Sequence, residues 1–439
     1  MGCESNNATP PAPAIAPGAE RIDPRAIAES IGAVDPRIPA IVPGFDAPFF
    51  QAGLAGYSDA AMRITARRHG CPYCITEALL DRTLLAGGRG FAKADLGEIE
   101  DNVPGGADDH PLAGQIMGSE PAEMAAAAIK MVEQGARSAK EYRRLAEQAR
   151  RHVGTKARSE RIEAQSAAHS DSDPSVPSCL RAFVPSGSMP FPRGFAAIDV
   201  NLACPVKKIA SKSRGGHWLA DPDGAIRILE GVREALPADI PVTVKMRRSF
   251  DDTPEMVDNF HRLFDAAYDI GCAWVTVHAR TVEQKYVGPS RWDLLRDIVR
   301  RTPDRVIFGS GDVWGAEDVF RMIGYTGVSA VSVARGCIGN PWIFRQARDL
   351  LAGRDPAPPT IDEQRAVLEQ HFDLALGVNA GMRDPEAHTG KTMRKFAIRF
   401  AAHHPDGDAV RRRFIAVKCL DDWRGVLDDH YIAEPAAVG

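Results

Sequence analysis

Short apolar runs alternate with longer amphipathic stretches between about residues 45 and 350. The runs are rich in valine and isoleucine, which favours strands, whereas the stretches between them repeat apolar residues at helical spacing. Eight strands that are each followed by a helix predict an α/β fold, the (β/α)8 TIM barrel, with functional groups at the carboxyl ends of the strands. The predicted strands lie near 47–52, 73–77, 112–117, 196–201, 241–246, 273–278, 305–309 and 330–334.

The predicted helices carry capping residues at their ends. Several begin at Asp, Ser or Pro and stop before Gly, as helix termini require. Five of these helices span 59–69, 121–134, 222–235, 256–270 and 316–323.

Three segments depart from this alternation. Residues 1–40 are rich in Pro and Ala and predict a disordered leader before a barrel domain over 41–352. Residues 137–195 form an insertion that is basic and helix-forming in its first half and linker-like in its second. We interpret it as either disordered or a basic helical arm, and a solvated charged helix explains it as well as nucleic-acid binding does. Residues 353–432 lack strands and predict a smaller, all-helical second domain.

Basic residues gather on one predicted helix face of this second domain. Lys391, Arg394 and Lys395 recur at the spacing that brings side chains together on a helix. Surface charge alone explains such a face in most proteins, so a role in binding needs a second line of evidence.

The composition of the chain limits the kinds of partner and cellular location that we expect. The chain carries 54 basic and 58 acidic side chains, a net charge of −4, so any polyanion has to be held by a local patch. We expect a cytoplasmic protein without a membrane segment, since no apolar run is long enough to cross a bilayer and no secretion signal begins the chain. Cys71 and Cys74 have zinc or redox spacing, but no second pair or nearby histidine accompanies them. Two buried thiols are favoured, and no metal site is expected.

Cys204 lies in the stretch NLACPVKK, just beyond the strand predicted over 196–201. A nucleophilic cysteine needs an activating base, and no histidine is nearby in the sequence. We therefore favour a general acid, a thiol that gives a proton to carbon, over a nucleophile. A loop cysteine without function is the alternative.

The other strand ends carry cationic groups and glycines. Glycines in GSGD and ARG, after the last two strands, allow backbone N–H groups to approach a phosphate. Lys245 and His278 would be costly to bury unpaired, which favours an anionic ligand between them. A structural salt bridge for Lys245 and an internal hydrogen bond for His278 are the alternatives. Gln115 can both donate and accept, as the edge of a flavin ring requires.

Taken together, these motifs resemble those of the tRNA-dihydrouridine synthases. The likeness covers about residues 45 to 430 apart from the insertion. This chain departs from the family pattern at Ala203, where Gly is usual, at Gly53 and Leu54, at Ser310, and at 217–218. The matching stretches are AGLAGYSDAAMR, ITEALL, NLACPVKK, VTVKMRRSFDD, VTVHARTVEQKYVGPSRWD, FGSGDVWGAEDVFRMIGYTGVSAVSVARGCIGNPWIF and KTMRKFAIRF.

The resemblance implies an FMN enzyme that reduces uridine in tRNA to 5,6-dihydrouridine, with NADPH as reductant. Cys204 would protonate C5 while hydride from the reduced flavin reaches C6, and Asn201 would hold the uracil. Arg280, Lys391, Arg394 and Lys395 would contact the tRNA substrate. The implied flavin-binding residues are Gly53, Leu54, Ala55, Gln115, Lys245, His278, Ser310, Gly311, Asp312, Ala334, Arg335 and Gly336.

We expect such an enzyme to be a monomer. Two alternative functions remain. The chain could be an FMN-dependent TIM-barrel oxidoreductase that acts on a small molecule, although such an enzyme has no use for a basic helical domain. It could instead be a catalytically silent tRNA-binding homologue, although Cys204 and Lys245 argue against that.

Overall fold

The computed structural model describes residues 18–86, 107–133, 138–151, 194–205 and 215–432. Its centre is a closed barrel of eight strands in which every pairing is parallel. The predicted (β/α)8 fold is therefore confirmed. The strands are β1 (Phe49–Gln51), β2 (Cys74–Ile75), β4 (Leu112–Met117), β5 (Ala197–Leu202), β6 (Val242–Ser249), β7 (Val275–Thr281), β8 (Ile307–Ser310) and β9 (Ala330–Val333).

A ninth strand, β3 (Leu79–Leu80), extends the sheet beside the end of β4. The sequence did not predict it, because its two leucines run directly into the helix that begins at Asp81. The ring closes where β2 pairs with both β1 and β4.

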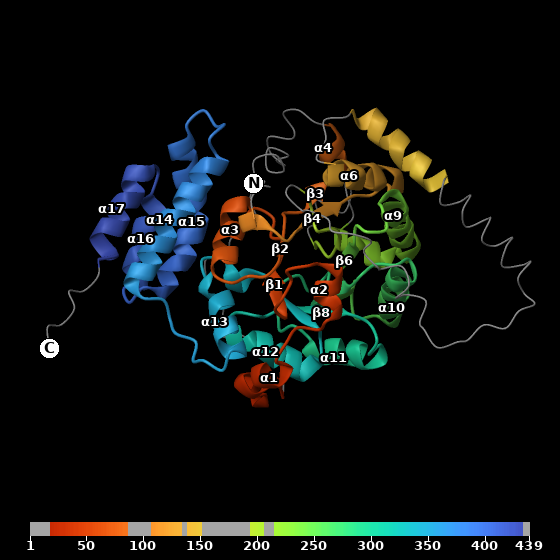
Figure 1. Ribbon diagram of the computed structural model, residues 1–439, viewed down its shortest axis with the longest axis horizontal. Helices are drawn as coiled ribbons and strands as arrows, with labels where there is room; N and C mark the ends of the chain where they lie inside the picture. Colours follow the sequence, from red (N-terminus) through yellow and green to blue (C-terminus); the bar gives the residue numbers. More distant parts are fainter. Residues whose placement is uncertain (1–17, 87–106, 134–137, 152–193, 206–214, 433–439) are drawn as a thin grey trace, which may run out of the picture.

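Helices surround the barrel (Figure 1). Asp59 and Asp221 cap two of them by accepting hydrogen bonds from backbone N–H groups, as their positions in the sequence predict. The barrel helices are α3 (Ala60–Arg68), α4 (Asp81–Ala86), α6 (Pro121–Glu133), α9 (Pro222–Ala235), α10 (Pro254–Asp269), α11 (Trp292–Arg301), α12 (Ala316–Thr326) and α13 (Trp342–Leu351).

An aromatic cluster fills the barrel at the amino-terminal ends of its strands. Phe45 stacks on Tyr73 with ring centroids 4.7 Å apart, and Trp274 lies 4.8 Å from Phe308. These four side chains are fully buried. These rings therefore fill the interior of the barrel at this end.

The predicted disordered leader is wrong for residues 18–40. The short helices α1 (Pro24–Ile31) and α2 (Arg37–Ile41) lie there, and Ala28 and Ile38 are fully buried. α1 packs against α12, and Ile38 joins the aromatic cluster. Isolated apolar residues in a Pro- and Ala-rich stretch gave no periodic signal, and their partners come only from the folded barrel. Residues 1–17 lie outside the described part.

The start of the insertion is helical over 139–151. Tyr142 is buried, and Arg143 pairs with Glu123 of α6 at 2.6 Å. This stretch therefore fits the helical-arm interpretation and packs on the barrel helices. The rest of the insertion, 152–193, lies outside the described residues.

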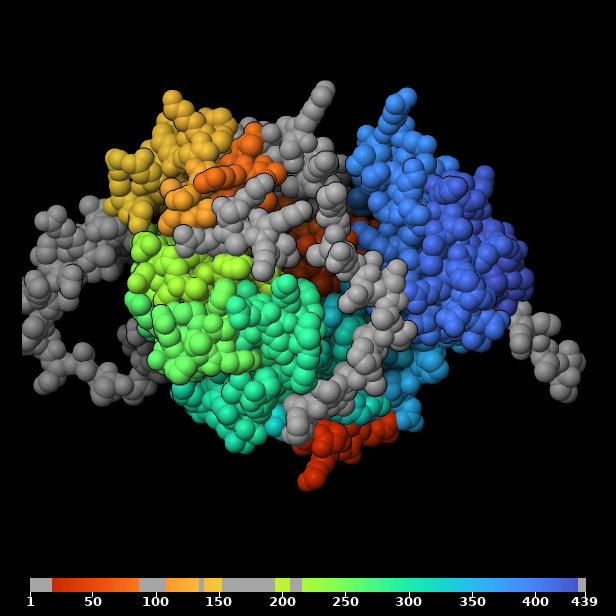
Figure 2. Space-filling view, turned by 180° about the vertical axis from the view of Figure 1, so that it is seen from behind, coloured from red at the N-terminus to blue at the C-terminus, as the bar shows by residue number. Residues whose placement is uncertain are grey.

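The second domain is helical, as predicted, and lies beside α3 and α13 (Figures 1 and 2). Trp423 packs between Phe372 and Phe414, with centroid distances of 4.9 and 5.0 Å, and forms its core. No helix in the described part of the chain is long and apolar enough to span a membrane. The domain consists of α14 (Ile361–Val378), α15 (Pro385–Phe400), α16 (Gly407–Ala416) and α17 (Leu420–His430).

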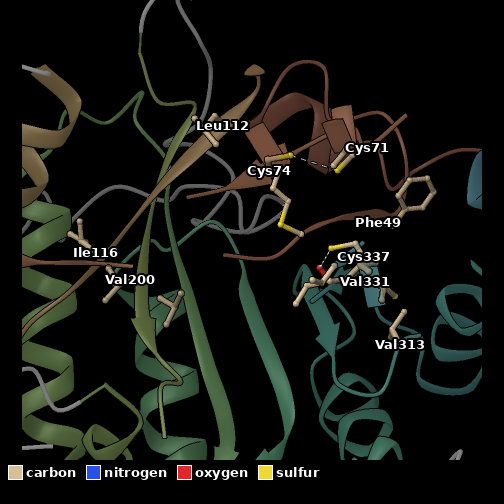
Figure 3. Close-up of a cluster of buried hydrophobic side chains, with 14 of the residues drawn as sticks. Phe49, Cys71, Cys74, Leu112, Ile116, Val200, Val313, Val331 and Cys337 are labelled. Carbon is tan, nitrogen blue, oxygen red and sulfur yellow. Dashed lines mark hydrogen bonds between the residues drawn. The ribbon is translucent and has the colours of Figure 1, made fainter. Parts of the chain in front are cut away.

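Cys71 and Cys74 are buried thiols, as favoured from the sequence. Their sulfur atoms lie 3.8 Å apart in the apolar layer shown in Figure 3. Nowhere in the described ranges do three or more His, Cys, Asp or Glu side chains form a group that could hold a metal ion.

Candidate active site

A cavity of about 340 Å³ opens at the carboxyl ends of the barrel strands. Its volume falls within the range of roughly 300–1,000 Å³ that is usual for small-molecule and cofactor sites. Most site residues predicted from the sequence line it together, although their roles stay predictions. They are Gly53, Leu54, Ala55, Gln115, Asn201, Cys204, Lys245, His278, Ser310, Gly311, Asp312, Ala334 and Arg335.

Cys204 lies in the turn that follows β5, partly buried at the cavity wall. The side-chain oxygen of Asn201 accepts hydrogen bonds from the backbone N–H groups of Ala203 and Cys204, at 2.9 and 3.1 Å. The backbone oxygen of Cys204 accepts from the N–H of Gly216 at 2.9 Å. The turn is thus held on both sides of the thiol.

Arg247 braces the same turn from the neighbouring strand. Its Nε donates to the backbone oxygen of Ala203 at 2.9 Å, and its Nη1 donates to those of Thr281 and Lys285, both at 2.7 Å. The Arg247 side chain therefore ties the Cys204 turn to the loop after β7. Burial lowers the pKa of Arg247 to about 10, which leaves it charged at neutral pH.

Cations dominate the other side of the cavity. Burial lowers the pKa of Lys245 to about 8, and the negative charge of Asp199 only partly offsets this effect. Burial and the cations around it hold the pKa of His278 well below its usual range, so its ring is neutral at pH 7. Burial also lowers the pKa of Arg335. Asp312 is the one carboxylate among the described lining residues.

Arg280 is buried behind Asp312 and does not line the cavity. Its guanidinium donates to both carboxylate oxygens of Asp312 at 2.6 Å, and Arg335 lies 3.6 Å from the same carboxylate. The geometry makes Arg280 a support of the cavity wall, whereas the resemblance had implied contact with substrate.

Glycines shape the cavity where strands end. Gly311 has φ of +118°, and the next residue, Asp312, has φ of +55°, so the chain turns sharply after β8. A Cβ at Gly336 would lie 2.3 Å from the backbone oxygen of Val313. Gly336 therefore lets the loops after β8 and β9 meet behind the cavity and is not itself part of the lining.

The cavity fits a ligand that combines a phosphate with a polar ring. Beside the cations, Nδ1 of His278 and Oγ of Ser332 are buried without a hydrogen-bond partner in the described structure. Buried polar atoms of this kind call for a partner. A flavin mononucleotide supplies an anionic phosphate and ring carbonyl groups, so the residues present suit it.

Arg247, Tyr286 and Trp314 are among the lining residues that were missed from the sequence. Arg247 stands two positions after Lys245 on the same strand, and period-two alternation could have placed both on the inner face. Tyr286, which is 54% exposed, and Trp314 lie in loops that carry no periodic signal. The guanidinium of Arg335 lies over both rings, 5.0 and 4.8 Å from their centroids.

The basic face of α15 does not reach the cavity lining. Lys391 is exposed and Arg394 is partly exposed. Lys395 turns toward the barrel instead, where its ammonium donates to the backbone oxygen of Gly56 and lies over the ring of Tyr57 at 5.2 Å. α15 thus contacts the loop after β1 that also supplies Gly53 to Ala55 of the cavity.

Comparison with known proteins relates the barrel from β5 onward and much of the helical domain to one family. The sequence model of the dihydrouridine synthase (Dus) family matches residues 187–411. A protein named "probable tRNA-dihydrouridine synthase" from Mycobacterium tuberculosis is 32% identical over 245 residues, which cover 53% of this chain and 58% of that one. The chain thus spans less than two thirds of the length of this relative.

Two further relatives have corresponding names. A "probable tRNA-dihydrouridine synthase" from Treponema pallidum is 31% identical, over 53% of this chain and 68% of its own length. "tRNA-dihydrouridine synthase B" from Shewanella oneidensis is 34% identical, over 45% of this chain and 61% of its own length. The solved histamine dehydrogenase from Rhizobium sp. 4-9 aligns with a TM-score of 0.42 and 12% identity, over 80% of this chain and 51% of that one. This similarity is too low to indicate a shared function.

Proposed function

Because this chain belongs to the dihydrouridine synthase family, we propose that it reduces uridine in tRNA to 5,6-dihydrouridine. One observation carries the proposal: the thiol of Cys204 lines the same cavity as the cations Lys245 and Arg335. A proton donor and a place for an anionic cofactor therefore share one space, which such a reduction requires.

FMN is the cofactor that we propose for this cavity, with NADPH as the reductant. Bound and reduced, the flavin supplies the hydride for C6 of the uracil. Lys245, His278 and Arg335 would hold the phosphate end, because they supply two cations and a neutral ring nitrogen. Gln115 would contact the ring through its side-chain amide.

Cys204 would hold the proton at Sγ and give it to C5 of the uracil. The turn is fixed by Asn201 and braced by Arg247, so the sulfur keeps one position while the base lies beside it. Such preorganisation lowers the barrier because no rearrangement is needed at the moment of transfer.

tRNA is the substrate that we propose, and the helical domain would bind it. A uracil inside folded RNA is stacked and has to be drawn out before an enzyme can reach its ring atoms. Lys391 and Arg394 on α15 would bind phosphates near the mouth of the cavity. Tyr286 offers an exposed aromatic ring at the rim.

The C204A variant tests the proposal. It is expected to purify with bound flavin and to bind tRNA like the wild type, while dihydrouridine formation falls by a factor of about 100 or more, in the range general acids contribute. The measurement is dihydrouridine by mass spectrometry of tRNA incubated with enzyme and NADPH. Undiminished product would contradict the acid role of Cys204.

A wild-type protein that takes up no FMN would favour a silent tRNA-binding protein, and turnover of small enones alone would favour a small-molecule enzyme.

A further inference from the structure

Three residues lie directly opposite one another on adjacent strands beneath the cavity. Gln115 of β4 is in register with Asp199 of β5, which is in register with Thr243 of β6. All three are buried, with exposures of 1% or less. Asp199 accepts hydrogen bonds from Nε2 of Gln115 at 2.7 Å and from Oγ1 of Thr243 at 2.6 Å.

The carboxylate decides how the amides above it are oriented. Burial raises the pKa of Asp199, and the hydrogen bonds from Thr243 and Gln115 and the positive charge of Lys245 act against this rise. In its ionised form the carboxylate can only accept hydrogen bonds, so the amide of Gln115 turns its NH2 group toward Asp199. Its oxygen then accepts from Nδ2 of Asn201 at 2.8 Å. This contact leaves the Asn201 oxygen to accept from the backbone N–H groups of Ala203 and Cys204.

We propose that Asp199 is a positioning residue for Cys204: its carboxylate anchors the far end of a hydrogen-bond chain through Gln115 and Asn201 that holds the Cys204 turn. Both ends require the same direction, because the backbone N–H groups of Ala203 and Cys204 can only donate and the carboxylate accepts. A group that neither touches the thiol nor lines the cavity itself thereby controls where the thiol lies.

The same chain determines what the cavity wall offers to a ligand. In both Gln115 and Asn201, one N–H of the side-chain amide donates within the hydrogen-bond chain, and the amide oxygen already accepts a hydrogen bond. Gln115 and Asn201 therefore present N–H donors to the cavity, which select a ligand with hydrogen-bond acceptors such as ring carbonyl oxygens. This selection of acceptor groups rests on the proposed function only where the ligand is identified as a flavin or uracil ring.

The first experiment is hydrogen exchange at the backbone amides of Ala203 and Cys204, measured on the full-length chain. D199L removes the acceptor and is expected to speed exchange at both amides at least tenfold. In D199N the new oxygen can accept from Gln115 while the new NH2 donates to the Thr243 hydroxyl, so protection is expected to stay within threefold of the wild type.

T243V is the matched control. It removes a hydrogen bond of nearly equal length from the same carboxylate but leaves the links to Gln115 and Asn201 in place. Its exchange at Ala203 and Cys204 is expected to match the wild type. Protection that survives in D199L, or that is lost equally in T243V, would overturn the proposal.

Q115M covers the case in which D199L does not fold. It breaks the chain between Asp199 and Asn201 at similar side-chain volume and leaves the bond to Thr243. Exchange at Ala203 and Cys204 is again expected to rise at least tenfold, and wild-type protection in Q115M would refute the chain.

Enzyme kinetics supply a second, separable readout. D199L is expected to lower kcat for tRNA at least tenfold with little change in KM, and D199N is expected to recover most of it. If exchange responds as expected but the wild type forms no dihydrouridine, the positioning role stands and the proposed function fails. If the wild type is active but exchange and kcat are unchanged in D199L, the positioning role fails alone.

Discussion

Lys245 shows, at the scale of one residue, that burial and a neighbouring anion have opposite effects on the charge of a lysine. Burial lowers its pKa from 10.5 to about 8, so protonated Lys245 destabilises the ligand-free fold at neutral pH. Because the unfolded chain holds this proton more tightly, the penalty is full below pH 8 and fades as the pH rises from 8 toward 10.5. An anion beside the ammonium would reverse the effect.

K245M is expected to remove this pH dependence. Between pH 7 and 9 the ligand-free wild type should gain about 1 kcal/mol of unfolding free energy relative to K245M, since each pKa unit corresponds to about 1.4 kcal/mol. Urea unfolding of both proteins at the two pH values measures the difference. The same variant should bind FMN more weakly at pH 7. Parallel pH profiles for the two proteins would show that Lys245 is not the titrating group.

At the scale of single elements, α15 uses its basic face in two ways. Lys391 points to solvent, whereas Lys395 is held against Gly56 and the ring of Tyr57. Each phosphate contact made by a cation releases counterions and steepens the salt dependence of binding. The two lysines should therefore differ when replaced.

K391A is expected to weaken tRNA binding and to reduce the slope of log K against log salt concentration by about 1, whereas K395A should also weaken FMN binding. Filter binding at several salt concentrations and a flavin titration measure both effects. Arg300, an exposed cation on α11, supplies the control R300A, for which no change is expected. Equal effects of K391A and R300A would argue against a phosphate-binding role for α15.

The elements also show what the sequence could and could not reveal. Strands such as β4 and β5 were predicted almost to the residue, because their apolar positions are interrupted only by single polar residues and the strands are bounded by turns. α1 escaped prediction because its burial depends on α12, which is distant in the sequence. For the site, the predicted barrel fold already implied that residues at the strand ends lie close together. The contact between Lys395 and Gly56 could not be predicted from the sequence, because it depends on how the two domains pack.

At the scale of the whole molecule, the barrel and the helical domain share an aromatic contact. Trp342 of α13 is fully buried and meets Phe400 and His403 edge-on, with centroid distances of 5.6 and 5.1 Å. Phe396 likewise meets Tyr57 of the barrel at 5.6 Å. Apolar contacts of this kind favour unfolding of both domains in one transition.

W342A is expected to lower the unfolding free energy by about 3–5 kcal/mol, the usual cost of deleting a buried large aromatic ring. The slowest-exchanging amides of β6 and α15 should lose protection together. Hydrogen exchange read by mass spectrometry measures both. I432A, at a side chain that is 63% exposed, serves as the control and should change stability by less than about 0.5 kcal/mol. Faster exchange in α15 alone would mean that the domains unfold independently.

The charge of the cavity contrasts with that of the chain that surrounds it. The protein as a whole is acidic, with a net charge of −4, yet Lys245, Arg247 and Arg335 converge at the cavity. The positive charge of these three residues attracts a polyanion toward the open end of the barrel. The electric field would thus orient an incoming polyanion before any contact forms, and it would favour encounters in which the cavity already faces the approaching molecule.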